Sequence, residues 1–179
     1  MVVIVLLYAH PYPQRSRANA ALLQAVRDLR GVEVHMLYDR YPDFAIDVEA
    51  EQRALSAAEV VVWQHPLYWY STPALLKLWF DKVLALGFAY GPGGTALQGK
   101  RCQWVVTTGG DFGSYGPDGM HQYPFGGFVT PIEQTARFCG MRWQPPLVLH
   151  GAHRVGDQAL REAAVGYRER LIELGARDA

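Results

Sequence analysis

Apolar and polar positions along the chain predict strands that alternate with helices. Three apolar runs, at 2–8, 60–64 and 102–108, are rich in β-branched residues and do not alternate with polar ones. Such runs are typical of strands covered on both faces, as in a parallel sheet. Weaker strand candidates lie at 32–37 and 143–149. Helical spacing of apolar residues predicts helices at 18–29, 48–57, 73–86, 129–138 and 157–174.

The alternation predicts an α/β fold with a doubly wound, five-stranded parallel sheet and helices on both faces. We expect the strand order 2-1-3-4-5. The 179 residues fit a single domain over 1–179, which is long enough to bury a core of its own. Ligands of such sheets collect outside the carboxyl ends of the strands, so candidate chemistry is sought in the loops that follow them.

Helix ends are marked by residues with capping chemistry. Ser16 can cap the first helix, and Gly31 can end it in a left-handed conformation. Thr72 followed by Pro73 has the order of cap and proline preferred at a helix start. These residues predict a helix just after the first strand and another after the third.

The charge and composition of the chain limit the classes of partner that it is expected to bind. Seventeen basic residues balance seventeen acidic ones, so we expect no nucleic acid partner. No apolar stretch approaches the roughly 20 residues that span a bilayer, and the first apolar run continues into His-Pro rather than a cleavage site. We therefore expect a cytoplasmic protein without direct membrane insertion. Cys102 and Cys139 form no Cys-x-x-Cys pair and are expected to be buried thiols.

The loop after the first strand offers groups that can hold a phosphate. It contains His10, Ser16 and Asn19, and it leads into the free N–H groups of a helix N-terminus. It lacks the glycine-rich patterns of dinucleotide-binding folds and P-loops. The alternative is that Ser16 only caps the helix and His10 is a satisfied turn residue.

An aromatic loop follows the third strand. Tyr68, Trp69 and Tyr70 are consecutive and cannot all face one core. A flat heteroaromatic ring is a natural occupant of such a loop, and an apolar dimer patch is the alternative; both can hold together. The fourth strand is followed by Thr107, Thr108, Gly109 and Gly110, where two glycines let backbone approach a ligand.

The motifs carry a family resemblance over nearly the whole chain. They are Leu-Tyr-Ala-His-Pro at 7–11 with Ser16 and Asn19, Leu-Tyr at 37–38, Tyr-Pro-Asp-Phe at 41–44, Trp-Gln-His-Pro-Leu-Tyr-Trp-Tyr-Ser at 63–71, Pro-Ala-Leu-Leu-Lys-Leu-Trp-Phe-Asp at 73–81, Gly-Phe-Ala-Tyr-Gly at 87–91 and Gly-Lys at 99–100. The chain resembles flavodoxin-2 type NAD(P)H:quinone oxidoreductases, and most closely the ancillary proteins of glutathione-regulated potassium-efflux systems. The Tyr-Pro-Asp-Phe and Gln-His-Pro stretches favour that branch.

The resemblance implies a flavodoxin-like fold and FMN, rather than FAD, as cofactor. Carried over by position, the FMN-binding residues are His10, Ser16, Arg17, Ala18, Asn19, Leu67, Tyr68, Trp69, Tyr70, Thr107, Thr108, Gly109 and Gly110. Tyr115 and His121 match a catalytic tyrosine and histidine that stabilise charge beside the flavin. The implied reaction is ping-pong transfer of hydride from NADH or NADPH to the flavin and then of two electrons to a quinone. Azo-dye reduction is possible on the same scaffold.

The resemblance also implies a second role, in which the chain is mainly a regulatory subunit that binds and activates a membrane potassium-efflux antiporter. It would then lie at the inner face of the membrane through that partner. A one-electron flavodoxin carrier is less favoured, because such carriers usually dock through acidic surfaces and this chain is neutral. The aromatic rim suggests a homodimer. His150 and His153 are expected to be surface or sheet-edge histidines, with no metal site.

Overall fold

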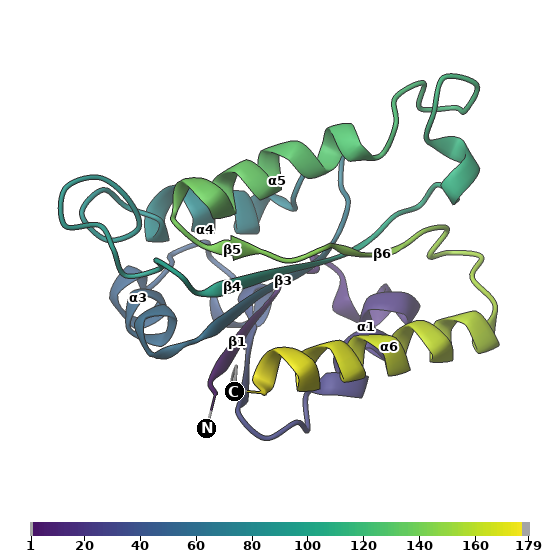
Figure 1. Ribbon diagram of the computed structural model, residues 1–179. Helices are drawn as coiled ribbons and strands as arrows, with labels where there is room; N and C mark the ends of the chain where they lie inside the picture. Colours follow the sequence, from purple (N-terminus) through teal and green to yellow (C-terminus); the bar gives the residue numbers. More distant parts are fainter. Residues whose placement is uncertain (1, 177–179) are drawn as a thin grey trace.

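A parallel sheet lies between two layers of helices in the computed structural model, which describes residues 2–176 (Figure 1). The strands are β1 (Ile4–Tyr8), β2 (Val32–Met36), β3 (Val60–Pro66), β4 (Arg101–Thr107), β5 (Arg142–Trp143) and β6 (Leu147–Leu149). Their order is β2-β1-β3-β4-β5, with β6 also beside β4. The predicted fold class and strand order are confirmed.

The fifth strand differs from the prediction of one run at 143–149. It is split into β5 and β6, and both pieces pair with β4 in parallel. Pro145 and Pro146 lie between them. Proline has no N–H to give to a ladder, so the edge strand is interrupted there.

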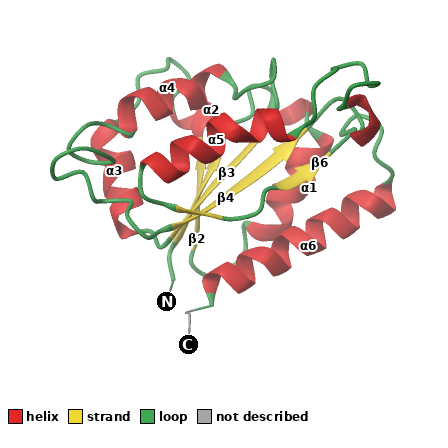
Figure 2. Ribbon diagram, turned by 45° about the horizontal axis from the view of Figure 1, so that its top comes forward, coloured by secondary structure: helices red, strands yellow, loops and turns green. Residues whose placement is uncertain are grey.

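The helices lie as two groups on opposite faces of the sheet (Figures 1 and 2). They are α1 (Arg17–Val26), α2 (Leu37–Arg40), α3 (Val48–Ala57), α4 (Ala74–Val83), α5 (Gly126–Phe138) and α6 (Asp157–Gly175). One core joins the sheet to α1 and α6, and the other joins it to α3, α4 and α5. Among the described residues, no helix is both long and apolar enough to cross a membrane.

Neighbouring residues of the central strands divide between the two cores. Leu6 and Val62 belong to the core with α1 and α6, whereas Leu7 and Trp63 belong to the other. All four are buried. Full burial of one such apolar side chain stabilises the fold by about 1.5–3 kcal/mol. Apolar runs without alternation are therefore what a sheet covered on both faces requires.

Ser16 caps α1 as predicted, with its Oγ accepting from the Asn19 N–H at 3.2 Å. Gly31 is left-handed, with φ at 90°, but α1 already ends at Val26, so Gly31 serves the turn into β2. The prediction that Thr72 caps α4 is wrong. Pro73 occupies the position before the helix, and its own extended backbone delays the first helical residue to Ala74.

Both cysteines are free and buried thiols, as predicted. Burial raises the pKa of Cys102 and raises that of Cys139 to about 11. Neither thiol is therefore ionised near neutral pH, and neither has the low pKa of a reactive cysteine.

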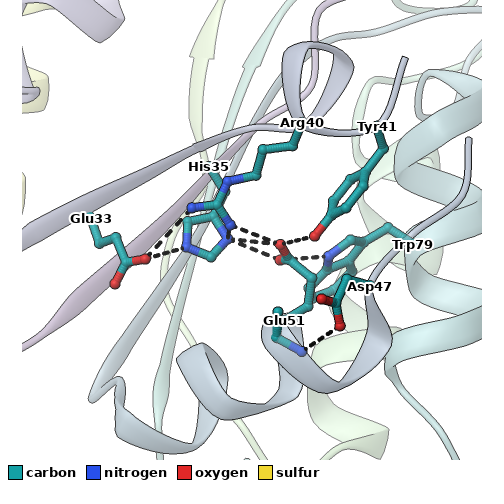
Figure 3. Close-up of polar contacts among 8 residues, drawn as sticks. Glu33, His35, Arg40, Tyr41, Asp47, Glu51 and Trp79 are labelled. Atoms are coloured by element: carbon teal, nitrogen blue, oxygen red, sulfur yellow. Dashed lines mark hydrogen bonds and ion pairs between the residues drawn. The ribbon is translucent and has the colours of Figure 1, made fainter. Parts of the chain in front are cut away.

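A buried carboxylate ties four elements together (Figure 3). Glu51 of α3 is fully buried and accepts from His35 Nδ1 at 2.9 Å, Arg40 at 3.0 Å, the Tyr41 hydroxyl at 2.8 Å and Trp79 Nε1 at 2.9 Å. Burial by itself raises the pKa of Glu51, but the hydrogen bond and charge of His35, with the bonds from Trp79 and Tyr41, outweigh burial and lower the pKa to about 2. The charge is thus paired rather than stranded in the core.

Replacing this carboxylate should make stability less dependent on pH. Because the folded pKa of about 2 lies below the ordinary 4.5, ionised Glu51 stabilises the fold above pH 4.5, and that contribution is lost as pH falls toward 2. We expect Glu51→Gln to lower the free energy of unfolding at pH 7 by roughly 3 kcal/mol. The difference from the parent protein should shrink below pH 4.5 in urea denaturation.

Glu49→Gln is the matched control, because Glu49 lies on the same helix, is exposed and pairs with Arg53 at 3.6 Å, its one ion pair among the described residues. Its effect should stay below about 1 kcal/mol. Equal losses for the two variants at pH 7 would contradict the role given to Glu51.

Candidate functional site

A cavity of about 450 Å³ opens at the carboxyl edge of the sheet. The loops after β1, β3 and β4 and the segment after β6 meet there. Its lining residues are His10, Tyr12, Arg15, Ser16, Arg17, Ala18, Asn19, Pro66, Leu67, Tyr68, Thr107, Thr108, Gly109, Ala152 and His153. The structure therefore brings together ten of the thirteen residues predicted to bind FMN. Trp69, Tyr70 and Gly110 do not line this cavity, and the role of all thirteen stays a prediction.

The first loop presents hydrogen-bond donors to the cavity. The Tyr12 N–H donates to His10 Nδ1 at 3.0 Å, so the ring carries its proton on Nε2. Burial lowers the pKa of His10, which keeps the ring neutral with one N–H to donate. Arg17 lines the cavity, but its guanidinium donates to the Val155 carbonyl at 2.7 Å and to the Asp157 carboxylate. These two hydrogen bonds join the start of α1 to the start of α6.

A chain of buried polar groups lies behind the first loop. Asn19 Nδ2 donates to Thr107 Oγ1 at 2.7 Å, Gln64 Nε2 donates to the Asn19 carbonyl at 3.0 Å, and the Tyr167 hydroxyl donates to Gln64 Oε1 at 3.2 Å. Asn19 Oδ1 is buried and accepts from none of the described residues. An acceptor left unpaired in a cavity wall is satisfied by a ligand that brings a donor such as a hydroxyl.

Sequence reasoning missed Gln64 and Tyr167 as parts of this site. Gln64 is fully buried in β3, and Tyr167 is fully buried on α6. A polar residue at the end of an otherwise apolar strand was the available signal for Gln64, because a buried amide needs partners. No local pattern marks Tyr167, since its partner is distant in the sequence.

The aromatic loop is a tight turn that holds its side chains outward. Tyr68 and Ser71 exchange backbone hydrogen bonds of 3.0 and 2.9 Å, and the two residues between them, Trp69 and Tyr70, have φ values of 46° and 63°. Two consecutive residues with side chains in the left-handed region are strained. Trp69 is 92% exposed, and Tyr70 stacks on Phe128 at 5.2 Å.

His65 fixes the start of this loop. Its Nε2 accepts from Trp104 Nε1 at 2.8 Å, which leaves Nδ1 to donate to the Pro66 carbonyl at 2.9 Å. Burial lowers the pKa of His65 to about 4, so the ring is neutral at physiological pH. The Leu67 N–H then donates to the Thr107 carbonyl at 2.8 Å and holds the loop against β4.

Tyr115 and His121 lie together beside Gly110. Their rings stack with centroids 4.6 Å apart, and the Tyr70 hydroxyl lies 3.3 Å from His121 Nδ1. A Cβ on Gly110 would come within 2.8 Å of His121 Nε2, so glycine makes room for the imidazole. Burial raises the pKa of Tyr115 above the ordinary 10, with a smaller opposing effect from Thr108, so the phenol is protonated at neutral pH with or without burial. The predicted pair is thus assembled, and its catalytic role stays a prediction.

The two later histidines also belong to this edge of the sheet. His153 is exposed, as expected, yet it lines the cavity and its ring lies 3.7 Å from the position of a Cβ on Gly109. His150 follows β6 directly, so of the two expected positions it takes the one at the sheet edge; it is half-buried and its Nδ1 lies 3.0 Å from Thr108 Oγ1. Residues 2–176 contain no cluster of three or more His, Cys, Asp or Glu arranged for a metal ion.

Comparison with known proteins gives close relatives. The chain is 49% identical over 171 residues, 96% of each chain, to the glutathione-regulated potassium-efflux system ancillary protein KefF of Klebsiella pneumoniae (strain 342). A structure described as a thermophilic tryptophan halogenase from Streptomycin violaceusniger has a TM-score of 0.89 and 39% identity and covers 95% of this chain and 98% of its own.

Two further solved structures name a cofactor or an activity. General stress protein 14 of Treponema denticola in complex with FMN has a TM-score of 0.85 and 34% identity, over 96% of this chain and 97% of that one. An NADPH-quinone reductase from P. pentosaceus has a TM-score of 0.85 and 27% identity, over the full length of both chains. The model of the flavodoxin-like fold family Flavodoxin_2 matches residues 3–171, and the chain belongs to that family.

Proposed function

We propose that this chain is an FMN-dependent oxidoreductase that takes two electrons from NADH or NADPH and passes them to a quinone. The proposal rests on the cavity at the carboxyl edge of the sheet, whose lining includes His10, Ser16 and the unpaired acceptor Asn19 Oδ1. It is supported by the relatives described as an FMN complex and as an NADPH-quinone reductase, to which the chain is 34% and 27% identical.

One end of the cavity suits the phosphate and the polyol chain of FMN. The first N–H groups of α1 have no intrahelical acceptors, and the helix dipole favours an anion there. His10 adds a neutral N–H, and Ser16 adds a hydroxyl. The unpaired Asn19 Oδ1 accepts a hydroxyl proton, which the ribityl chain can give. These residues would hold the tail of FMN.

The other end suits a flat ring. Leu67 and Tyr68 line it on one side, and Gly109 lets backbone come close on another. The flavin, when bound, supplies the group that receives hydride and returns two electrons. The chain's own part is to orient that ring, keep water away and hold charge at its polar edge.

Tyr115 and His121 are placed to manage protons and charge. Reduction of a quinone to a hydroquinone adds two electrons and two protons, so the site needs donors near the quinone oxygens. The Tyr115 phenol is protonated at neutral pH, and burial raises its pKa further above the ordinary 10. His121 Nε2 is buried and, within the described part of the chain, has no partner. We assign the phenol and the imidazole as the general acids of this step.

A second copy of this chain fits the exposed apolar rim beside the site. Trp69, Phe112, Met120 and Tyr123 are between 68% and 92% exposed. They lie on the loops that follow β3 and β4, and large apolar side chains are costly to leave in water. We propose that a homodimer covers them, with its site near the interface.

We also propose an ancillary role in potassium efflux. The observation that favours it is 49% identity over 96% of both chains to the ancillary protein KefF, a likeness well above that to the quinone reductase structure. In this role the protein works in the cytoplasm and reaches the inner face of the membrane by binding the antiporter.

The purified protein should bind FMN tightly enough to be yellow and should lose oxidised-flavin absorbance on mixing with NADH or NADPH, then regain it when a quinone is added. Stopped-flow spectroscopy measures both half-reactions.

Ser16→Ala should weaken FMN affinity by about tenfold, because it removes a hydroxyl and the cap of α1. Ser56→Ala is the control, since that hydroxyl bonds the Gln52 carbonyl on α3 away from the cavity. FMN-loaded protein that stays oxidised with both nucleotides would refute the proposal.

Tyr115→Phe should keep FMN bound and keep the ring stacked on His121, yet slow quinone reduction by about 100-fold through loss of the proton donor. The reduction of FMN by the nucleotide should change less. Tyr123→Phe, at a position 68% exposed, is the control. An unchanged kcat for Tyr115→Phe would remove the tyrosine from the mechanism.

The ancillary role predicts that His10→Ala abolishes quinone reduction while potassium efflux through the antiporter remains activated. Docking to a membrane protein uses the outer surface, whereas His10 is buried in the cavity wall. Efflux and quinone reduction should be measured in the same cells, with Tyr70→Ala as a second variant. Joint loss of both activities in each variant would tie activation to the bound flavin instead.

A further inference from the structure

The hydroxyl of Thr108 is a junction that the proposed reaction does not use. It donates to the Gly110 carbonyl at 2.7 Å, and it lies 3.0 Å from His150 Nδ1. Thr108 also acts on Tyr115, whose pKa it lowers in part against the larger effect of burial. Thr108 is almost fully buried, so its hydroxyl is oriented by these partners rather than by water.

The number of protons available at the Thr108 hydroxyl determines which ring nitrogen of His150 is protonated. A threonine hydroxyl has one proton and two lone pairs, and a carbonyl can only accept. Because the Thr108 proton is given to Gly110, His150 must present Nδ1–H to the hydroxyl oxygen. Burial lowers the pKa of His150, although Asp111 opposes this, so the ring is neutral and Nε2 carries no proton.

The Gly110 carbonyl, which accepts from Thr108, also connects the Gly109–Gly110 pair to the loop that follows β6. Gly110 O also accepts from the Gly151 N–H at 2.8 Å, and the Thr108 carbonyl accepts from the Ala152 N–H at 2.8 Å. Within residues 2–176, the N–H groups of Gly109 and Gly110 have no acceptor. Two successive glycines have more conformational freedom than any other pair, so these donors need anchors on neighbouring atoms to keep one direction.

We propose that His150 is a positioning residue: through the Thr108 hydroxyl it holds the Gly110 carbonyl. It thereby orients the free N–H of Gly109, in the cavity wall, and that of Gly110, the next residue behind it, toward the polar edge of the bound flavin. The inference rests on the proposed function, since it names residues that tune the same site. It assigns His150 no contact with substrate or cofactor.

Donors fixed in this way favour the reduced flavin over the oxidised one. Two-electron reduction places negative charge on the pyrimidine side of the ring, and a hydrogen bond to a charged acceptor is worth more than one to a neutral acceptor. If the N–H groups lose their direction, the reduced form loses more binding energy than the oxidised form. The midpoint potential of the bound flavin then falls.

Two substitutions at His150 separate this role from simple packing. The ring lies among Phe112, Tyr115 and Phe125, with centroid distances of 5.6, 5.3 and 5.0 Å. His150→Phe keeps an aromatic ring among these neighbours but removes the donor. His150→Asn removes the ring but places an amide N–H near the position of Nδ1–H. Packing alone predicts that asparagine is the worse substitute, and the positioning role predicts the reverse.

The deciding measurement is the two-electron midpoint potential of FMN bound to the parent protein and to both variants, together with the dissociation constant of oxidised FMN. We expect His150→Phe to lower the ratio of reduced to oxidised affinity by about tenfold, which lowers the potential by about 30 mV. His150→Asn should recover most of this loss. Thr108→Val should reproduce the phenylalanine variant, and Thr108→Ser should restore the potential, which keeps the test available if a His150 variant does not fold.

Histidine tautomers in the FMN-free protein give an independent readout by ¹⁵N NMR. The proposal predicts the Nδ1–H tautomer for His150, and the Nε2–H tautomer would overturn it. A potential that is the same in the parent, His150→Phe and Thr108→Val proteins would also overturn it while leaving FMN binding and quinone reduction intact. Failure of the parent protein to bind FMN would overturn the proposed function and this inference with it.

Discussion

Parallel pairing of β1 with β3, and of β3 with β4, brings three strand ends to one edge of the sheet and determines where every candidate group lies. The ladders run in register from Ile4 and Val60 to Tyr8 and Gln64, and on from Gln64 and Val105 to Pro66 and Thr107. Loops that are far apart in the sequence therefore begin side by side. A cavity forms between them because the sheet ends there and the helices that follow β1 and β3, α1 and α4, pack on opposite faces of it.

Hydrogen bonds between buried polar groups hold these loops in fixed positions relative to one another. On the side of α1 and α6, Tyr167 bonds Gln64, Gln64 bonds the backbone of Asn19, and Asn19 bonds Thr107. The opposite side has His65, whose two nitrogens link Trp104 to the Pro66 carbonyl. Such networks stabilise little in net terms, because each bond replaces one to water, but a broken one leaves a costly unpaired group. They therefore specify one geometry for the site.

Much of the fold could be predicted from the sequence because its signals are local. The apolar runs that became β1, β3 and β4, the cap at Ser16 and the helix at Val48–Ala57 each depend on neighbours in the chain. The errors also have local causes. Pro145 and Pro146 interrupt the edge strand, and the extended backbone of Pro73 moves the start of α4 to Ala74, so Thr72 does not cap it. The hydrogen-bond partners of Tyr167 and His150 could not be predicted, because they lie 103 and 42 residues away in the sequence.

A crystal structure of the protein grown with FMN tests the central claim most directly. We expect the phosphate to lie against the N-terminus of α1 near Ser16, with a ribityl hydroxyl on Asn19 Oδ1 and the ring between Tyr68 and Gly109. FMN ordered at another surface, or an empty cavity at saturating FMN, would contradict the account.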